Sequence, residues 1–270
     1  MIIELLGAPS AGKTTLARSL TGRLRDRQIP IELWLSYRPA ELSNRAATGS
    51  TIRRRGPSTV LRRIARPAFE LLNAARNPLE NPSDAALSGK LMRILKPRNL
   101  LWSLRMRQYM QRLSYAWLRA ARSSDIVLFD QGFGQAICSL AVVAAEQSEW
   151  RIERALREVP AADLVVRLRV DDEIIAQRLR ARALGQSWIE RLLEFDVDAN
   201  LRVARLVDTV QDALSRLERP LLAFDAQDYN ALERALAMLE HAVIDMYQNR
   251  QAKELRSVSE RGRIAAGSFR

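Results

Sequence analysis

The chain of 270 residues contains one cysteine, Cys138, and one histidine, His241. A single cysteine excludes a disulfide framework, and it makes a reduced, cytoplasmic compartment the expected location. A single histidine, with no partner histidine, makes neither a zinc site nor a Ser-His-Asp triad. Cys138 stands in an apolar run and is interpreted as a small buried residue.

Long apolar runs are also missing. No stretch approaches the roughly 18 apolar residues that a membrane-spanning helix needs. The apolar run at the N-terminus is short and meets a glycine turn at once, so we expect no signal peptide. Apolar residues still make up 47% of the chain, which is enough for a sizeable core.

Acidic residues are scarce in one segment. Residues 45–122 contain 17 Lys and Arg but only three acids, Glu70, Glu80 and Asp84. The whole chain carries a formal charge of +12, so this segment accounts for the entire excess. Prolines divide it into short pieces of helical pattern at 57–75, 87–95 and 99–122. We interpret it as a basic helical insertion, because it is far longer than a single crossover between strands requires.

Elsewhere the apolar pattern predicts alternating strands and helices. The predicted strands are residues 1–6, 31–35, 125–130, 162–170 and 221–225. The predicted helices are residues 13–27, 133–146, 172–183, 189–216 and 229–247. This alternation predicts an α/β fold of three layers, with a parallel sheet and the insertion between its second and third strands. A single domain is expected over residues 1–247, and the polar, basic tail at 248–270 has the composition of a disordered segment.

Residues 7–14 match the phosphate-binding pattern Gly-x-x-x-x-Gly-Lys-Thr in full. The pattern lies between a predicted strand and a predicted helix, which is the context that a P-loop requires. Backbone N–H groups of such a loop face phosphate oxygens, and the following helix adds its positive end. The predicted nucleotide-binding residues here are Gly7, Ala8, Pro9, Ser10, Ala11, Gly12, Lys13, Thr14 and Thr15. Lys13 is expected to contact the β- and γ-phosphates of ATP, and Thr14 to hold Mg²⁺.

With the P-loop in place, further stretches make the chain resemble the thymidylate kinase-like group of P-loop nucleoside and nucleotide kinases. These stretches are Ile126 to Gly132, Asp163 to Val170 with the arginines that follow it, Trp188 to Phe195, and Phe224 to Gln227. The resemblance covers residues 1–38 and 122–247 and leaves out the basic insertion. It implies a phosphotransferase of the same P-loop fold.

Asp130 ends a predicted central strand, at the edge where open α/β sheets bind ligands. It is a candidate to accept the acceptor's proton or to hold the water shell of Mg²⁺; the alternative is a structural strand end. Arg178 and Arg182 lie four residues apart on one helix face, so they could clamp the transferring phosphate or stack on adenine. A solvated basic face is the alternative for this pair.

The resemblance also implies an acceptor side and an adenine side. Arg38 resembles the arginine of the group's acceptor loop, and Gln131 stands where the group carries an arginine after the aspartate. Asn200 and Val203 replace the group's Arg and Tyr, so we expect an acceptor other than dTMP. The residues that resemble the adenine-side loop are Asp225, Ala226 and Gln227.

The function expected from the sequence is ATP-dependent phosphoryl transfer to a small anionic or hydroxyl-bearing acceptor. Nucleoside, nucleotide, sugar, antibiotic and lipid head group all stay open, as does a homodimer. The alternatives are a nucleotide-binding switch, or an NTPase associated with nucleic acid or with a membrane. Arg178 and Arg182, here called the lid arginines, belong to the chain itself. This favours the kinase, because switches usually receive such an arginine from a partner.

The insertion carries a cluster of arginines, namely Arg45, Arg53, Arg54, Arg55, Arg62, Arg63 and Arg66. Three explanations compete for it. The segment could pack on the acceptor side with its arginines solvated or paired. It could bind an anionic acceptor or nucleic acid through clustered cations. It could instead lie on an anionic membrane, which would make the protein peripheral to that membrane.

Overall fold

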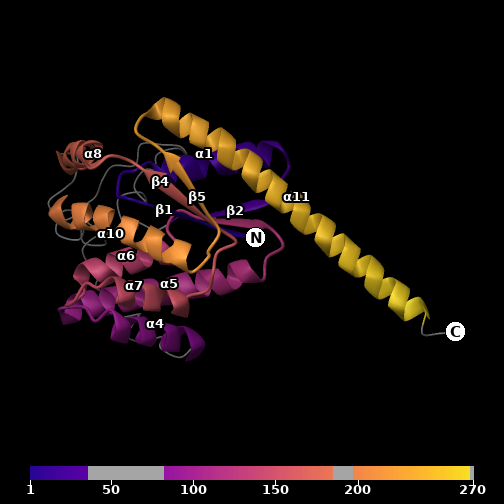
Figure 1. The fold of residues 1–270 in the computed structure, drawn as a ribbon, viewed down its shortest axis with the longest axis horizontal. Helices are drawn as coiled ribbons and strands as arrows, with labels where there is room; N and C mark the ends of the chain where they lie inside the picture. Colours follow the sequence, from indigo (N-terminus) through magenta and orange to yellow (C-terminus); the bar gives the residue numbers. More distant parts are fainter. Residues whose placement is uncertain (36–81, 185–196, 268–270) are drawn as a thin grey trace, which may run out of the picture.

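The computed structural model describes residues 1–35, 82–184 and 197–267. Its central sheet consists of β1 (Ile2–Gly7), β2 (Ile31–Trp34), β3 (Ile126–Phe129), β4 (Leu164–Arg169) and β5 (Leu221–Asp225). The strand order is β2-β3-β1-β4-β5 and every pair is parallel. Figure 1 shows the sheet in the middle of the fold with helices around it. All five predicted strands are present, each within two residues of its expected bounds.

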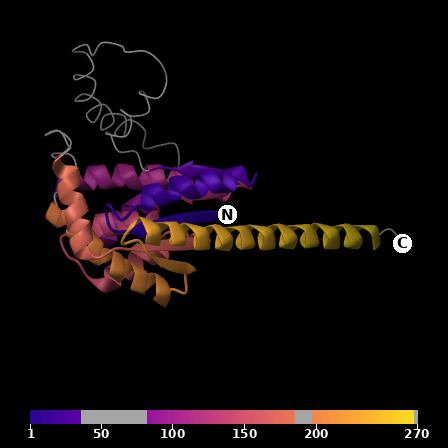
Figure 2. The same ribbon diagram turned by 90° about the horizontal axis from the view of Figure 1, so that it is seen from above.

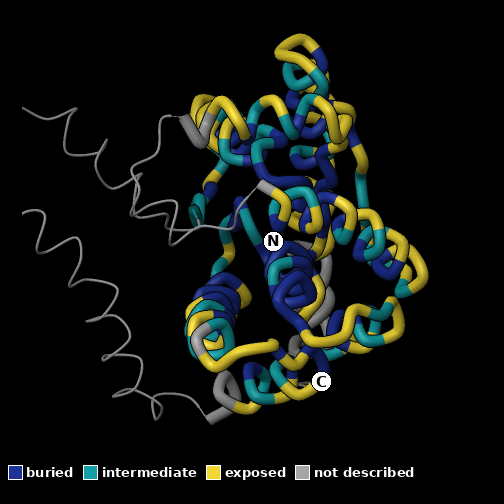
Figure 3. The backbone as a smooth tube through the Cα atoms, turned by 90° about the vertical axis from the view of Figure 1, so that its left-hand side faces the viewer, coloured by how far each residue is buried: buried dark blue, intermediate teal, exposed yellow. Residues whose placement is uncertain are grey.

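Helices cover both faces of the sheet, so the predicted α/β fold class is confirmed. The helices α1 (Lys13–Asp26) and α11 (Tyr229–Gly267) lie on one face. The other face carries α5 (Leu100–Ala121), α6 (Phe133–Val143), α7 (Glu149–Glu158) and α10 (Val197–Arg216), with α4 (Pro82–Ile94) packed on α5 and α7. The helix α8 (Asp172–Leu184) follows β4. Buried segments run through the middle of the molecule, and exposed ones follow the outer sides of the helices (Figure 3).

Strand β1 shows why the sheet is buried on both faces. Its residues alternate between two cores, because successive side chains of a strand point to opposite faces. Ile3 and Leu5 belong to the core under α1 and α11. Ile2 and Leu6 belong to the core under α5, α6 and α10. A strand in this position therefore appears in the sequence as a nearly continuous apolar run.

The described part of the basic insertion is an integral part of the domain core. Leu91, Met110 and Trp117 are fully buried, and the ring of Trp117 stacks on that of Phe129 in β3 at 5.1 Å. The helices predicted at 87–95 and 99–122 are confirmed as α4 and α5. The arginines of α5 are exposed, and the apolar side chains on its inner face pack into this core. The arginine cluster at 45–66 lies outside the described residues.

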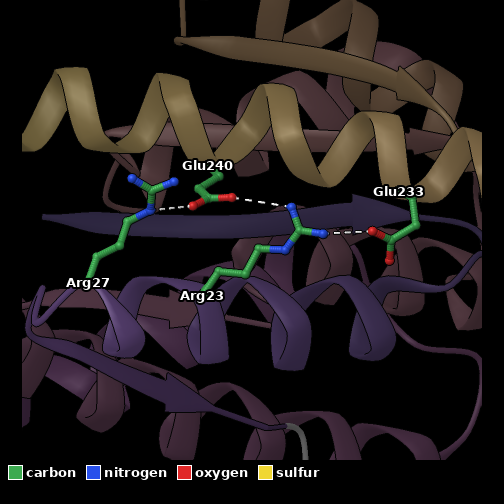
Figure 4. Close-up of polar contacts among 4 residues, drawn as sticks. All are labelled: Arg23, Arg27, Glu233 and Glu240. Carbon is green, nitrogen blue, oxygen red and sulfur yellow. Dashed lines mark hydrogen bonds and ion pairs between the residues drawn. The ribbon is translucent and has the colours of Figure 1, made fainter.

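A network of ion pairs holds α11 against α1. Arg23 pairs with Glu233 at 2.6 Å and with Glu240 at 3.3 Å. Arg27 pairs with the same Glu240 at 2.6 Å (Figure 4). Each carboxylate comes from α11 and each guanidinium from α1 or the residue that ends it, so the network fixes how far one helix can slide along the other.

Helix α11 is 39 residues long and continues to Gly267, well past residue 247, where the sequence pattern placed its end. Its second half extends away from the rest of the described chain (Figure 2). Residues 248–267 belong to this helix, although their composition is that of a disordered segment. The segment is polar, but it is rich in Ala, Gln, Glu, Lys and Arg, which have high helix propensity.

The single cysteine and the single histidine differ in burial. Cys138 is fully buried, and this burial raises the pKa of its thiol to about 12, which makes it unreactive. His241 is exposed and lies 3.4 Å from Asp245, one turn further along α11. None of the helices in the described ranges combines the length and the apolarity needed to cross a membrane.

Candidate active site

The loop between β1 and α1 has the backbone of a phosphate cradle. Gly12 precedes α1 with a φ of 95°, a conformation that glycine adopts at little cost. Ser10 also has a positive φ, of 64°. Gly7 lies against β4 so closely that an added Cβ would be 3.0 Å from the carbonyl oxygen of Leu168. Both glycines of the pattern are therefore required on steric grounds.

Lys13 is held inside this loop. Its Nζ donates to the carbonyl oxygens of Gly7 at 2.6 Å and of Ala8 at 2.8 Å. The residue is only 7% exposed. The loop therefore encloses a positive charge at the end of β1, next to the positive end of α1.

Thr14 and Asp130 meet beside this charge. The Thr14 Oγ1 donates to Asp130 Oδ2 at 3.3 Å, although 116 residues separate them in the sequence. They come together because β3 pairs directly with β1, so the residue after β3 lies beside the start of α1. Asp130 is 2% exposed, and its backbone N–H donates to the carbonyl of Trp34 at the end of β2. The two residues predicted to hold Mg²⁺ are thus neighbours.

Arg178 of α8 bridges two loops. Its guanidinium donates to the carbonyl oxygens of Ser10 in the P-loop at 3.4 Å and of Gln227 at 2.7 Å. A longer contact of 3.5 Å reaches the carbonyl of Ala226. The predicted lid arginine, P-loop and adenine-side loop therefore converge at one place.

A second connection ties the adenine-side loop to the start of α8. Gln227 and Asp171 exchange two hydrogen bonds of 2.9 Å, one through the backbone N–H of Asp171 and one through its side chain. The backbone N–H of Ala226 donates to Arg169 at 2.8 Å. Leu232 of α11 lies within 4 Å of where a side chain on Gly12 would begin. The loop is thus fixed against β4, α8 and the P-loop together.

The other predicted site residues have different outcomes. Thr15 and Asp225 are exposed, and Gln131 is half-buried next to Asp130. Arg38 lies outside the described residues. Arg182 belongs to α8, but its side chain is also outside what the structure describes.

Sequence reasoning missed two polar residues behind the P-loop. Gln135 of α6 is buried and accepts a hydrogen bond from the backbone N–H of Gly7 at 3.3 Å. Arg167 of β4 is 6% exposed and donates to Asp208 at 2.5 Å and to Gln211 at 3.1 Å, both on α10. Burial lowers the pKa of this guanidinium and the charge of Asp208 opposes that shift, so Arg167 stays charged. An arginine within an apolar strand is the signal that points to such a buried pair.

Glu4 is the third residue that the sequence did not single out. Its carboxyl group lies in the middle of β1 and faces the start of α6, where the backbone N–H groups of Gly134 and Phe133 donate to it. It leaves so little room that a Cβ on Gly132 would lie 1.9 Å from Glu4 Oε2. Oε2 has no hydrogen-bond partner among the described residues. Glu4 therefore caps α6 from a neighbouring strand and requires glycine at position 132.

Complete burial raises the pKa of Glu4 to about 7, although the two N–H groups and the charge of Arg219 oppose the shift. Because the folded protein holds this proton more tightly than the unfolded chain, the stability it contributes is present below pH 4.5. That contribution is lost as the pH rises towards 7.

We expect the free energy of unfolding to fall by up to roughly 3 kcal/mol more in the wild type than in Glu4→Gln between pH 5 and pH 8. Urea unfolding at both pH values measures this difference. The exposed Glu149→Gln serves as the matched control and should retain the wild-type slope. Equal slopes in the wild type and Glu4→Gln would contradict the burial of an acid at this position.

No protein-family model matches the chain, and no curated protein matches it. Among solved structures it is similar to deoxyadenosine kinase from M. mycoides with the products dCMP and a flexible dCDP bound. That similarity has 14% sequence identity and a TM-score of 0.47, over 91% of this chain and 100% of the other. A second structure of this kinase, with bound dCTP, gives 13% identity and a TM-score of 0.44 over the same shares.

Proposed function

We propose that the protein is an ATP-dependent phosphotransferase that acts on a small-molecule acceptor. The observation that carries this proposal is the contact between Thr14 and Asp130 beside the enclosed ammonium of Lys13. Phosphoryl transfer needs little covalent chemistry from a protein; it needs positioned cations and a group that orients the nucleophile. Lys13 and a Mg²⁺ held by Thr14 would be the positioned cations, and Asp130 would orient the nucleophile.

The residues present fit ATP with Mg²⁺. Magnesium in such sites takes one or two protein oxygens and completes its shell with phosphate oxygens and water. The Thr14 hydroxyl and the Asp130 carboxylate would be the protein oxygens that hold it here. No group of three or more metal-ligating side chains occurs in the described ranges. The first turn of α1 carries no side-chain cap, so its N–H groups face the loop.

Each residue then has a distinct task. When bound, Mg-ATP would supply the phosphoryl group, and its Mg²⁺ would neutralise part of the charge on that group. Lys13 and the N–H groups at the start of α1 attract the terminal phosphates and hold them at the end of β1. Asp130 either accepts the proton of the acceptor hydroxyl or orients the water around the metal. Because Asp130 is almost fully buried, its orientation is fixed before the acceptor arrives.

The position of Arg178 favours a kinase over a nucleotide-binding switch. This arginine comes from the same chain and already spans the P-loop and the adenine-side loop. A switch usually obtains its arginine from a partner protein, which keeps hydrolysis slow until the partner binds. An arginine held within the chain instead completes the site whenever nucleotide is bound.

Arg178→Ala is expected to raise the KM for ATP and to lower kcat, because the variant loses the cation that contacts both the P-loop and the adenine-side loop. Losing a charged donor of this kind costs about 10²-fold in turnover. Arg180→Ala is the matched control, because Arg180 lies two residues away on α8 and is exposed. Steady-state rates of ADP release distinguish the two variants. Identical losses in both would remove Arg178 from the site.

The acceptor is proposed to be a nucleoside or a nucleotide-like compound with a free hydroxyl group. It would lie beside Asp130 at the ends of β2 and β3, the edge where ligands of open α/β sheets bind. The direct test is to incubate the protein with Mg-ATP and, separately, nucleosides, nucleoside monophosphates, sugars and aminoglycosides, and to follow phosphorylated product by mass spectrometry. ADP formation without a phosphorylated product in any set would favour the switch or NTPase function.

A further inference from the structure

The outer side of helix α5 exposes apolar side chains. Leu100 is 85% exposed, Tyr115 58% and Leu118 38%. These are three of the six large apolar side chains that are exposed in the described ranges. The half-buried Leu104 belongs with them, because spacings of four, eleven and three residues place all four on one side of the helix. The stripe that they form is distinct from the inner face of α5, which packs into the core.

Positive charge borders this stripe. Helix α5 and the residue that caps its C-terminus contain no acid, and their arginines are all exposed, namely Arg105, Arg107, Arg112, Arg119 and Arg122. Three of the arginines follow one another at intervals of seven residues, which is close to two turns, so they form a row along one border. Arg107 falls on the other border. The apolar stripe, about 27 Å long from Leu100 to Leu118, is therefore framed by cations.

Three of these arginines are available to an external anion. Arg119 pairs with Glu32 at 3.8 Å, and the guanidinium of Arg105 lies 5.0 Å from the centre of a tryptophan ring. Arg107, Arg112 and Arg122 form no ion pair with any described residue. The wider segment of residues 85–124 contains nine Lys and Arg and no acid, so no carboxylate of this segment competes for them.

We propose that the outer side of α5 docks on the surface of an anionic lipid membrane. The helix lies parallel to that surface, and the side chains of Leu100, Tyr115 and Leu118 enter the boundary between head groups and acyl chains. Arginine side chains extend their apolar stems along such a boundary and place the guanidinium at the lipid phosphates. The proposal goes beyond the phosphotransferase function and uses none of the residues of the P-loop site.

The apolar stripe favours a membrane over other partners. Nucleic acid would use the arginines, but it gains nothing from exposed leucines, and Tyr115 is a single aromatic ring rather than a stacking platform. A protein partner needs a compact patch of about 800 Å² with an apolar centre. Here the apolar side chains form a narrow strip that Gln108 and Gln111 interrupt. A flat lipid surface requires only such a strip.

Like charge disfavours a second possible occupant, the chain's own residues 45–66. That segment carries seven arginines and no acid. Two surfaces that are both positive repel one another, whereas both are attracted to the same anionic surface. An anionic membrane is therefore the partner whose charge fits α5.

The test is flotation of the full chain with lipid vesicles. We expect binding to phosphatidylcholine vesicles that contain about 30% phosphatidylglycerol, no binding to pure phosphatidylcholine, and at least a tenfold loss between about 0.1 M and 0.5 M salt. Arg112→Gln combined with Arg122→Gln should weaken binding by about 20-fold, because each cation near the surface contributes about fivefold. Leu100→Ser combined with Tyr115→Ser should weaken it by about tenfold through loss of apolar contact.

Helix α11 offers a matched control on the other face of the sheet (Figure 1). Arg234 and Met238 lie four residues apart there; both are exposed, Met238 by 62%. Arg234→Gln combined with Met238→Ser removes one cation and one apolar side chain and should bind vesicles as the wild type does. Thermal unfolding and Mg-ATP turnover should stay unchanged in all of these variants, which separates a lost surface from a folding defect.

A fluorescent label identifies the side that contacts lipid. Because Cys138 is fully buried, a cysteine introduced at an exposed position is the only reactive thiol. An environment-sensitive label on Tyr115→Cys should brighten and shift to the blue with anionic vesicles, and one on Met238→Cys should not. The proposal is overturned if the α5 variants bind as the wild type does, or if both labels respond alike. It is also overturned if single-stranded RNA or duplex DNA binds through Arg112 and Arg122 while vesicles do not bind.

Discussion

Lys13→Ala is expected to lower phosphoryl transfer by about 10²–10³-fold and to weaken binding of Mg-ATP. Lys13 is the only side-chain cation of the P-loop itself, and its Nζ is already held at the end of β1 by two carbonyl oxygens. Alanine removes that charge where the β- and γ-phosphates are expected, and no neighbouring residue of the loop replaces it. Calorimetric titration with Mg-ATP and rates of ADP release measure the two effects.

The matched control is Arg18→Ala, which removes a positive charge from an exposed position of the same helix. It should change nucleotide affinity little, because exposed charges are screened by water and salt. Thermal unfolding of both variants separates a site effect from a folding defect. If Lys13→Ala binds and turns over Mg-ATP as the wild type does, the P-loop assignment is wrong.

Asp130→Asn is expected to reduce turnover by about 10²–10⁴-fold while ATP affinity changes by a much smaller factor. Asparagine keeps the shape of the side chain and can still accept from Thr14, but it can neither take up a proton nor carry the negative charge that a metal favours. The effect should therefore appear in kcat rather than in the dissociation constant of ATP.

Asp125→Asn tests the same substitution at the other end of the strand. Asp125 directly precedes β3, at the edge opposite the P-loop, so its loss should leave the rate unchanged. Pre-steady-state and steady-state rates for both variants decide whether the chemical step is affected. A normal rate for Asp130→Asn would leave Asp130 as a structural strand end, held by Thr14 and Trp34.

The sequence predicts the strands of this fold well, because buried parallel strands have continuous apolar runs bounded by turns. Strand β5 has the predicted bounds, and the convergence of Lys13, Thr14 and Asp130 follows from strand order alone. Helix α7 was missed, because its short pattern of ten residues follows a longer apolar helix. In α5 the exposed arginines dominate the composition, whereas the apolar residues of the inner face decide the packing.

Glu4 and Arg167 show what a sequence pattern leaves open. A charged residue within an apolar run is consistent with an exposed strand face until it is known that both faces are covered. Only the positions of α6 and α10 show that each side chain is buried next to a polar partner. Likewise, the bridge made by Arg178 depends on where the adenine-side loop lies, and helix periodicity contains no information on that.

Helix α11 has a mechanical consequence. It begins next to the adenine-side loop, where Asp228 accepts from the backbone N–H of Ala231, and the ion pairs with α1 lie in its first third. At 1.5 Å per residue, 39 residues form a rod about 58 Å long, so a tilt of about 5° at its start displaces its far end by about 5 Å. A small movement at the adenine-side loop, where the helix begins, is therefore magnified at the far end of the helix.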